Sequence, residues 1–101
     1  MANQFGDRVR QLREKQHLLL RQVAPLLEMD TPQLSKIERG ERTAKKEQVG
    51  KLAEILKADK NELLTLWLAD QLYEVVKDED FAIKAMEVAQ KELVSKTKSK
   101  K

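Results

Sequence analysis

In this 101-residue sequence, the residues best suited to binding an anion are four basic side chains with only Glu41 to oppose them. They are Arg39, Arg42, Lys45 and Lys46. Guanidinium and ammonium groups bind phosphate oxygens, which leaves nucleic acid open as a partner. The chain has no Cys and one His, which excludes disulfides, thiolate metal sites and multi-histidine metal sites. No set of nucleophile, base and orienting group is suggested, so we expect no enzyme and no cofactor.

Charge is distributed unevenly along the chain, whose net charge is +3. Residues 1–60 hold 13 Lys and Arg against 9 Asp and Glu, residues 61–95 hold 3 Lys against 8 acids, and residues 96–101 hold 4 Lys and no acid. These blocks indicate different roles along one chain. No apolar run approaches the ~20 residues of a membrane span, and the N-terminus lacks a signal peptide's apolar stretch, so we expect a cytoplasmic protein without a membrane partner.

Apolar residues recur at helical spacing, and the sequence contains only three Gly and two Pro. This pattern predicts an all-α chain. The first helix has a face at i, i+4 and i+7, formed by Phe5, Val9 and Leu12. A later helix has the same kind of face, formed by Val49, Leu52, Ala53 and Leu56.

Two short helices joined by a tight turn lie between these elements. The first is predicted over Leu20–Leu27, where Pro25 removes a hydrogen bond and should kink or shorten the helix. The turn, Glu28-Met29-Asp30, ends on a carboxylate that can cap the second helix, predicted over Thr31–Arg39. Gly40 then supplies a left-handed stop.

The second of these helices contains the run Leu34-Ser35-Lys36-Ile37-Glu38-Arg39-Gly40, which resembles the Cro and phage-repressor type of helix-turn-helix, the Xre family. Further positions match that family, namely Val23-Ala24, Met29, Leu52-Ala53 and Leu56. The resemblance covers about residues 5–64. It implies a five-helix, lambda-repressor-like DNA-binding domain, in which the first helix of the motif crosses the DNA backbone and the second enters the major groove.

The resemblance also implies which residues read bases, namely Thr31, Pro32, Gln33 and Lys36. Gln33 can pair bidentately with adenine, and Lys36 can donate to guanine. The methyl of Thr31 and the ring of Pro32 can touch a thymine methyl. A second role is open for Gln33, whose side chain could instead complete a capping box on Asp30.

Phosphate contacts are assigned by the resemblance to the basic loop after the second helix, namely Arg39, Arg42, Lys45 and Lys46. For Lys45 and Lys46 an ordinary solvated face is the alternative. The family usually has a capping Ser or Thr at the position of Leu19 and often a phosphate-binding Gln at that of Leu20. Because both are Leu here, we expect Arg21 to substitute as a phosphate contact.

Several charged residues have a structural interpretation. By the resemblance, Arg13 and Glu38 form a salt bridge beneath the motif. His17 is expected in the turn between the first two helices, where the family has a small or Gly-like residue, rather than as a titrating group. The acids Asp78-Glu79-Asp80 are expected at the start of a sixth helix as capping residues, rather than as ligands of a cation.

Beyond the head of residues 1–60, a fifth helix at about Lys60 to Lys77 and a sixth helix should form a helical hairpin over residues 61–94. The hairpin carries more apolar surface than a single stripe, while the head already has a core. We therefore expect a two-fold homodimer that contacts through Trp67, Leu68, Leu72, Tyr73, Val76 and Phe81. Residues 95–101 lack apolar side chains and are expected to be a disordered lysine-rich tail, which adds DNA affinity or merely solubility.

Two functions follow from these expectations. The first is a dimeric transcriptional regulator that binds double-stranded DNA at a palindromic operator, as a repressor, a restriction–modification controller or an antitoxin-like protein. The second is a protein–protein adaptor that uses the acidic hairpin, with the helix-turn-helix as scaffold and a partner of unknown identity. The absent phosphate anchor at Leu20 and the exposed-looking run Leu18-Leu19-Leu20 favour the adaptor.

Overall fold

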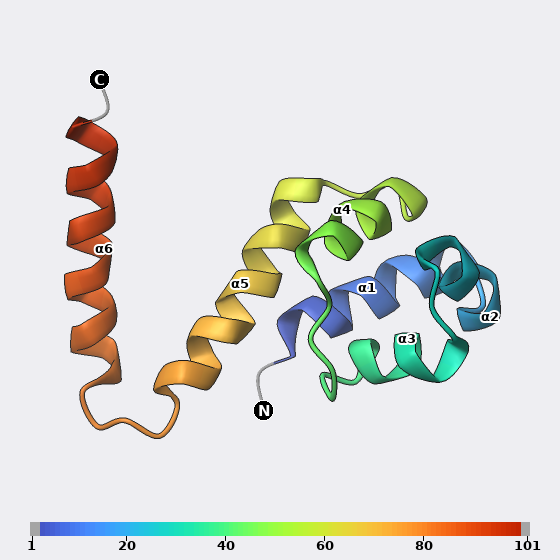
Figure 1. Cartoon of the computed structure of the whole chain (residues 1–101), viewed down its shortest axis with the longest axis horizontal. Helices are drawn as coiled ribbons and strands as arrows, with labels where there is room; N and C mark the ends of the chain where they lie inside the picture. Colours follow the sequence, from blue (N-terminus) through green and yellow to red (C-terminus); the bar gives the residue numbers. More distant parts are fainter. Residues whose placement is uncertain (1–2, 100–101) are drawn as a thin grey trace.

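The computed structural model describes residues 3–99, with side chains through Thr97. In this range the chain forms six α-helices, one 3-10 turn and no strand. The order is α1 (Gln4–Lys15), α2 (Leu20–Val23), η1 (Ala24–Leu27), α3 (Thr31–Glu38), α4 (Lys46–Ile55), α5 (Lys60–Val76) and α6 (Ala82–Ser99). The predicted all-α fold is confirmed. The helices up to α5 gather in one body and α6 stands apart from it (Figure 1).

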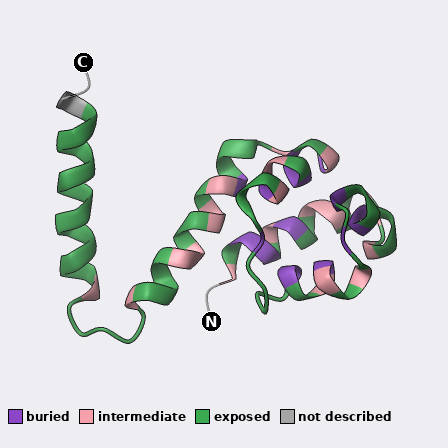
Figure 2. Cartoon of the chain, viewed as in Figure 1, coloured by how far each residue is buried: buried purple, intermediate pink, exposed green. Residues whose placement is uncertain are grey.

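A single core holds α1, the α2–η1–α3 segment, α4 and the first half of α5 together. It is made of apolar side chains that are almost fully removed from water, namely Phe5, Val9, Val23, Ala24, Leu27, Met29, Leu34, Ile37, Ala44, Val49, Leu52, Ala53, Leu56 and Leu63. Buried residues are confined to this body (Figure 2). Leu64, Leu66 and Trp67 pack against the same core, so the head continues past the boundary at residue 60 that we predicted.

The helix that contains Pro25 is interrupted as its sequence predicts. The α-helical part ends at Val23, and a 3-10 turn with Pro25 in its first turn continues to Leu27. Glu28 then adopts a left-handed backbone with φ of 57°, and the amide of Met29 donates to the carbonyl of Ala24 at 3.2 Å. Because proline has no N–H and fixes its own φ, the tighter turn accommodates it where a regular helix would not.

Both ends of α3 are set by the residues that the sequence indicated. The carboxylate of Asp30 accepts a hydrogen bond from the amide of Gln33 at 2.8 Å. Gly40 has a φ of +77°, and its amide donates to the carbonyl of Ile37 at 3.1 Å. The regular helix ends at Glu38, one residue earlier than predicted.

Two polar contacts fix how α5 lies on the head. Local sequence patterns predicted neither of them. The carboxylate of Asp70 accepts hydrogen bonds from the amides of Gln4 at 3.1 Å and Phe5 at 2.9 Å, so α5 caps the start of α1. The indole of Trp67 donates to the carbonyl of Ala44 at 2.8 Å, which ties α5 to the segment before α4. Helix α5 is therefore part of the head from its start to Asp70.

The last two helices diverge after a short turn at residues 77–81 (Figure 1). Asp78-Glu79-Asp80 lie exposed in this turn, close to the N-terminus of α6, where the macrodipole favours negative charge. Helix α6 continues through Ser99, so residues 95–99, which we expected to be disordered, are helical. No Gly or Pro stops the helix there, and lysines suit a helix C-terminus. Residues 100–101 of the predicted tail lie outside the described residues. None of the helices in residues 3–99 could cross a membrane.

Candidate nucleic-acid interface

Helix α3 divides sharply into a buried side and a side that faces water. Leu34 and Ile37 point into the core and are almost fully buried. On the other side Pro32 and Lys36 are exposed, and Thr31 and Gln33 are half-buried. The four residues predicted to read bases therefore share the outward side and the first turns of one capped helix.

The side chain of Gln33 is not used for capping. Asp30 accepts the amide of Gln33, which is the first half of a capping box. The second half would require the Gln33 side chain to bond to the amide of Asp30, and within residues 3–99 that side chain makes no hydrogen bond. The NH2 group of this carboxamide is thus available to donate hydrogen bonds to an external partner, and its oxygen is available to accept them.

The loop between α3 and α4, together with the first residue of α4, carries the predicted phosphate contacts. Arg39, Arg42, Lys45 and Lys46 are all exposed. They are not equally available, because Arg39 forms an ion pair with Glu41 at 2.9 Å between Nε and Oε2. The amide of Lys45, at the start of α4, donates to the side chain of Gln48 at 2.8 Å, and this fixes the backbone at the end of the loop.

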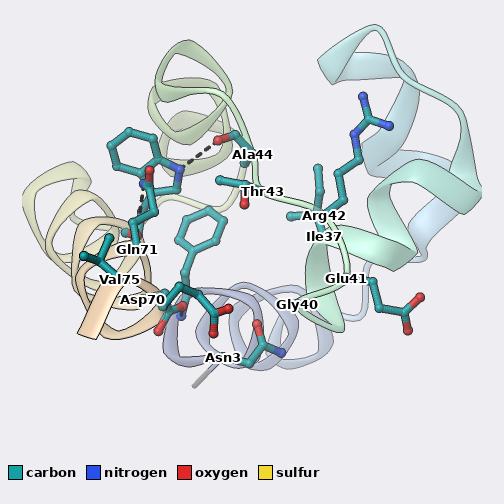
Figure 3. A pocket seen from close by; sticks show the side chains of 13 residues that line it. Asn3, Ile37, Gly40, Glu41, Arg42, Thr43, Ala44, Asp70, Gln71 and Val75 are labelled. Carbon is teal, nitrogen blue, oxygen red and sulfur yellow. Dashed lines mark hydrogen bonds between the residues drawn. The ribbon is translucent and has the colours of Figure 1, made fainter. Parts of the chain in front are cut away.

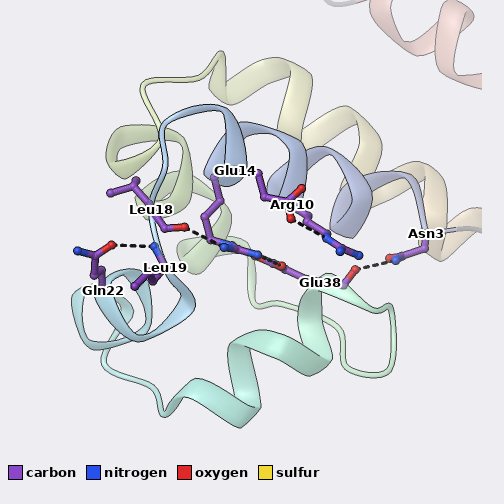
Figure 4. Close-up of polar contacts among 8 residues, drawn as sticks. Asn3, Arg10, Glu14, Leu18, Leu19, Gln22 and Glu38 are labelled. Carbon is purple, nitrogen blue, oxygen red and sulfur yellow. Dashed lines mark hydrogen bonds and ion pairs between the residues drawn. The ribbon is translucent and has the colours of Figure 1, made fainter.

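The N-terminus of α2 lacks the Ser or Thr cap that is usual in the family, and Gln22 serves there instead. The side chain of Gln22 reaches back and accepts the amide of Leu19 at 2.7 Å (Figure 4). Leu18 and Leu20 pack against the core, and only Leu19 of the three is exposed. The run of three leucines is therefore not a continuous exposed patch. Arg21 is exposed on α2, as its predicted role requires.

Behind α3, the predicted salt bridge between Arg13 and Glu38 is confirmed (Figure 4). The hydrogen bond with Glu38 raises the pKa of Arg13 above its ordinary value, because it stabilises the charged guanidinium. Asn3 donates to the carbonyl of Glu38 at 2.8 Å. His17 has the left-handed φ of 57° that the family's small residue would suit, and it lies exposed in the turn after α1. Helix α3 is thus supported from behind by α1.

A pocket of about 390 Å³, which the sequence did not indicate, lies between the loop after α3 and helix α5 (Figure 3). Phe5 and Trp67 contribute apolar walls, and Arg42 and Glu74 contribute charge at its lining. Asp70 also lines the pocket, but its carboxylate already caps α1. Within the described residues, no group of three or more His, Cys, Asp or Glu side chains is placed to hold a metal ion.

The predicted dimer residues separate into two groups. Trp67 packs on the head and its indole N–H is bonded within the chain. The others face away from the head, with Val76 half-buried and the remainder exposed, namely Leu68, Leu72, Tyr73 and Phe81. Their apolar surface is left uncovered by the described residues.

Comparison with known protein families matches residues 4–66 to the helix-turn-helix domain. The chain belongs to the helix-turn-helix domain family. The comparisons with curated proteins and with solved structures found no match. In this helix-turn-helix chain, α2 with η1 is the first helix of the motif and α3 is the second. The matched range ends within α5, which agrees with the extent of the head's core.

Proposed function

We propose that this helix-turn-helix protein is a sequence-specific, double-stranded DNA-binding transcriptional regulator of the Cro and phage-repressor (Xre) type. The observation that carries the proposal is the outward side of α3. It combines an intact N-cap at Asp30 with the exposed Lys36 and the half-buried Gln33, whose side chain makes no hydrogen bond within the described residues. A second helix of this kind enters the major groove in helix-turn-helix proteins.

In the proposed mechanism, α3 lies in the major groove and presents its N-terminal turns to the base edges. Thr31, Pro32, Gln33 and Lys36 read the bases, with Gln33 suited to adenine and Lys36 to guanine. Phosphates are held on either side of the groove by Arg21, Arg39, Arg42, Lys45 and Lys46. The cap at Asp30 and the support from Arg13 fix the position of α3, so that the base-reading side chains are already oriented before DNA binds.

The same proposal includes a homodimer on a palindromic operator. Within residues 3–97, twelve large apolar residues are exposed, and ten of them lie on α5, α6 and the turn between them. Apolar surface of this extent marks an association site. A two-fold dimer through residues 61–94, with Leu68, Leu72, Tyr73, Val76 and Phe81 at the contact, would place two α3 helices about 34 Å apart, one turn of DNA.

The test begins with selection of bound duplexes from a random-sequence pool, because the operator is unknown. The full chain should enrich a palindromic motif, and the enriched duplex should be bound about 10³-fold more tightly than random duplex at the same salt. Binding of all duplexes with equal affinity would refute sequence-specific regulation. Repressors, restriction–modification controllers and antitoxin-like regulators all share this mechanism, and the genes next to this one would separate them.

An adaptor function is the second candidate, and the uncovered apolar surface of α5 and α6 is the observation that favours it. The other feature that favoured it is weaker in the structure, because Leu18 and Leu20 pack on the core. In this function the helix-turn-helix is a scaffold. Mutations on the outward side of α3 would then leave the affinity for the protein partner unchanged. Enrichment of no motif by the full chain would support the adaptor.

A further inference from the structure

The loop between α3 and α4 has little hydrogen bonding of its own. Up to Glu41 the backbone is bonded to α3, and from Lys45 onward it is bonded to α4. Between these points, residues 42–44 make one hydrogen bond within the part of the chain that the structure describes. The indole of Trp67 on α5 donates this bond to the carbonyl of Ala44 at 2.8 Å, and it is the dashed line that reaches Ala44 in Figure 3.

Burial holds the same short segment at the same residue. Arg42 and Thr43 are exposed, and both line the pocket of about 390 Å³ that lies between the loop and α5. Ala44 is the buried one of the three, and it belongs to the core against which Trp67 packs. The middle of the loop is therefore fixed to the head at Ala44, two residues after Arg42.

Arg42 depends on this fixed point because its own side chain has no partner in the chain. It points away from Asp70 and Gln71 of α5 (Figure 3), and within residues 3–97 it forms neither an ion pair nor a hydrogen bond. A mobile loop that binds a phosphate must be ordered at that moment, and ordering it costs free energy. A loop whose backbone is already held avoids part of this cost, so it binds the phosphate more tightly.

We propose that Trp67 is a positioning residue for DNA binding. Its indole N–H holds the carbonyl of Ala44 and thereby orders the loop that presents Arg42 to the DNA backbone. The inference rests on the proposed function, because it concerns how the phosphate contacts of that function are arranged. Since phosphate contacts carry no base information, Trp67 determines the affinity for every duplex and leaves the preference among duplexes to α3.

Trp67→Phe tests this role, because it keeps an aromatic ring against the core and removes the donor. In anisotropy titrations of the full chain, made at a temperature where every variant is folded, it should weaken binding to selected and random duplexes about fivefold. The ratio of the two affinities should stay within about twofold of the parent's ratio. The matched control is Asp70→Ala, which removes the other tie between α5 and the head. It should leave both affinities within about twofold of the parent's, and an equal loss in the control would overturn the inference.

A double-mutant cycle tests whether Trp67 acts through Arg42. When Arg42→Ala is already present, Trp67→Phe should weaken binding less than about twofold, because the contact that it positions is gone. An equal loss with and without Arg42→Ala would overturn the inference. So would parent-like binding by Trp67→Phe, which would leave the proposed function standing if the parent still selects its duplex. A parent chain that prefers no duplex would refute the proposed function, and one that binds none would refute the inference with it.

The single Trp of the sequence allows a second test that preserves the shape of the ring. Biosynthetic incorporation of benzothienylalanine replaces only the indole N–H of Trp67, by sulfur, and should give the same loss of about fivefold even if Trp67→Phe does not fold. Without DNA, the heteronuclear NOE of the backbone amides of residues 42–44 should fall in this chain and stay at the parent value in Asp70→Ala. Unchanged NOE values would show that the indole does not order the loop, and they would overturn the inference.

Discussion

The guanidinium of Arg13 holds the carboxylate of Glu38 through two hydrogen bonds, from Nε to Oε2 at 2.7 Å and from Nη2 to Oε1 at 3.0 Å. A third bond runs from Nη1 to the carbonyl of Leu18 at 2.8 Å. The side chains of the pair are only 11% and 5% exposed. One buried cation therefore connects α1, the loop before α2 and the last turn of the helix proposed to read DNA.

Arg13→Ala should lower the free energy of unfolding by about 3–5 kcal/mol, because it leaves the carboxylate of Glu38 buried without a counter-charge. Denaturant unfolding of the full chain measures this loss. The control is Arg10→Ala, whose ion pair with Glu14 is exposed and whose loss should cost less than about 1 kcal/mol. Equal losses in the two variants would contradict a structural role for the buried pair.

Asp70→Ala should also destabilise the head, by about 1–2 kcal/mol, because the amides of Gln4 and Phe5 lose their shared acceptor. The melting temperature of the full chain is a suitable measurement. Asp78→Ala removes the same charge from the exposed turn after α5 and should change that temperature little. If Asp78→Ala has the larger effect, the tie between α5 and α1 is not important for stability.

His17→Gly should stabilise the chain by about 0.5–1 kcal/mol, because glycine adopts the left-handed backbone at this position without steric cost. Lys15→Gly, two residues earlier in the last turn of α1, should instead cost about 0.5–1 kcal/mol. Opposite signs for two glycine substitutions so close together would exclude a general effect of glycine. Chemical denaturation of the parent chain and of the two variants measures both changes. The free energies of unfolding are compared with the same dependence on denaturant concentration for all three proteins.

Features set by neighbours in the chain were predictable from the sequence. Asp30, Pro25 and Gly40 act within a few residues of themselves, through capping, a missing N–H and a left-handed stop, so their types alone indicated the ends of the helices. The pair of Arg13 and Glu38 spans 25 residues, and only resemblance to a known motif could predict it. Which residues lie on the outward side of α3 was likewise predicted from local residue types and from the resemblance to a known motif.

Features set by tertiary contact were not predictable. Asp70 lies 65 residues from the amide of Phe5, and nothing in a helical pattern tells a capping carboxylate from a solvated one. Trp67 looked like part of an apolar stripe, but its indole found a carbonyl on the head. The pocket between α5 and the loop depends on both contacts, so it too could not be expected.

Gln33→Ala and Lys36→Ala should each weaken binding to the selected duplex by about 1–3 kcal/mol and relax the preference at one base position. Neither change should alter stability by more than about 0.5 kcal/mol, because Lys36 is exposed and the side chain of the half-buried Gln33 makes no hydrogen bond within the described residues. Fluorescence anisotropy with the selected duplex and with variants at each base position measures the effect. An equal loss on selected and on random duplex would show that these side chains do not read bases.

Arg42→Ala should weaken binding to selected and random duplexes alike, and it should reduce the slope of log K against log salt by about one.

Arg39→Ala should have a smaller effect, because the ion pair with Glu41 already partly neutralises Arg39. By the same reasoning Glu41→Gln should strengthen binding to every duplex at low salt and make the slope steeper. Anisotropy titrations over a range of salt concentrations measure all three slopes. A Glu41→Gln chain that binds no more tightly than the parent would place Arg39 outside the phosphate contacts, while Arg42 would still be tested by its own slope.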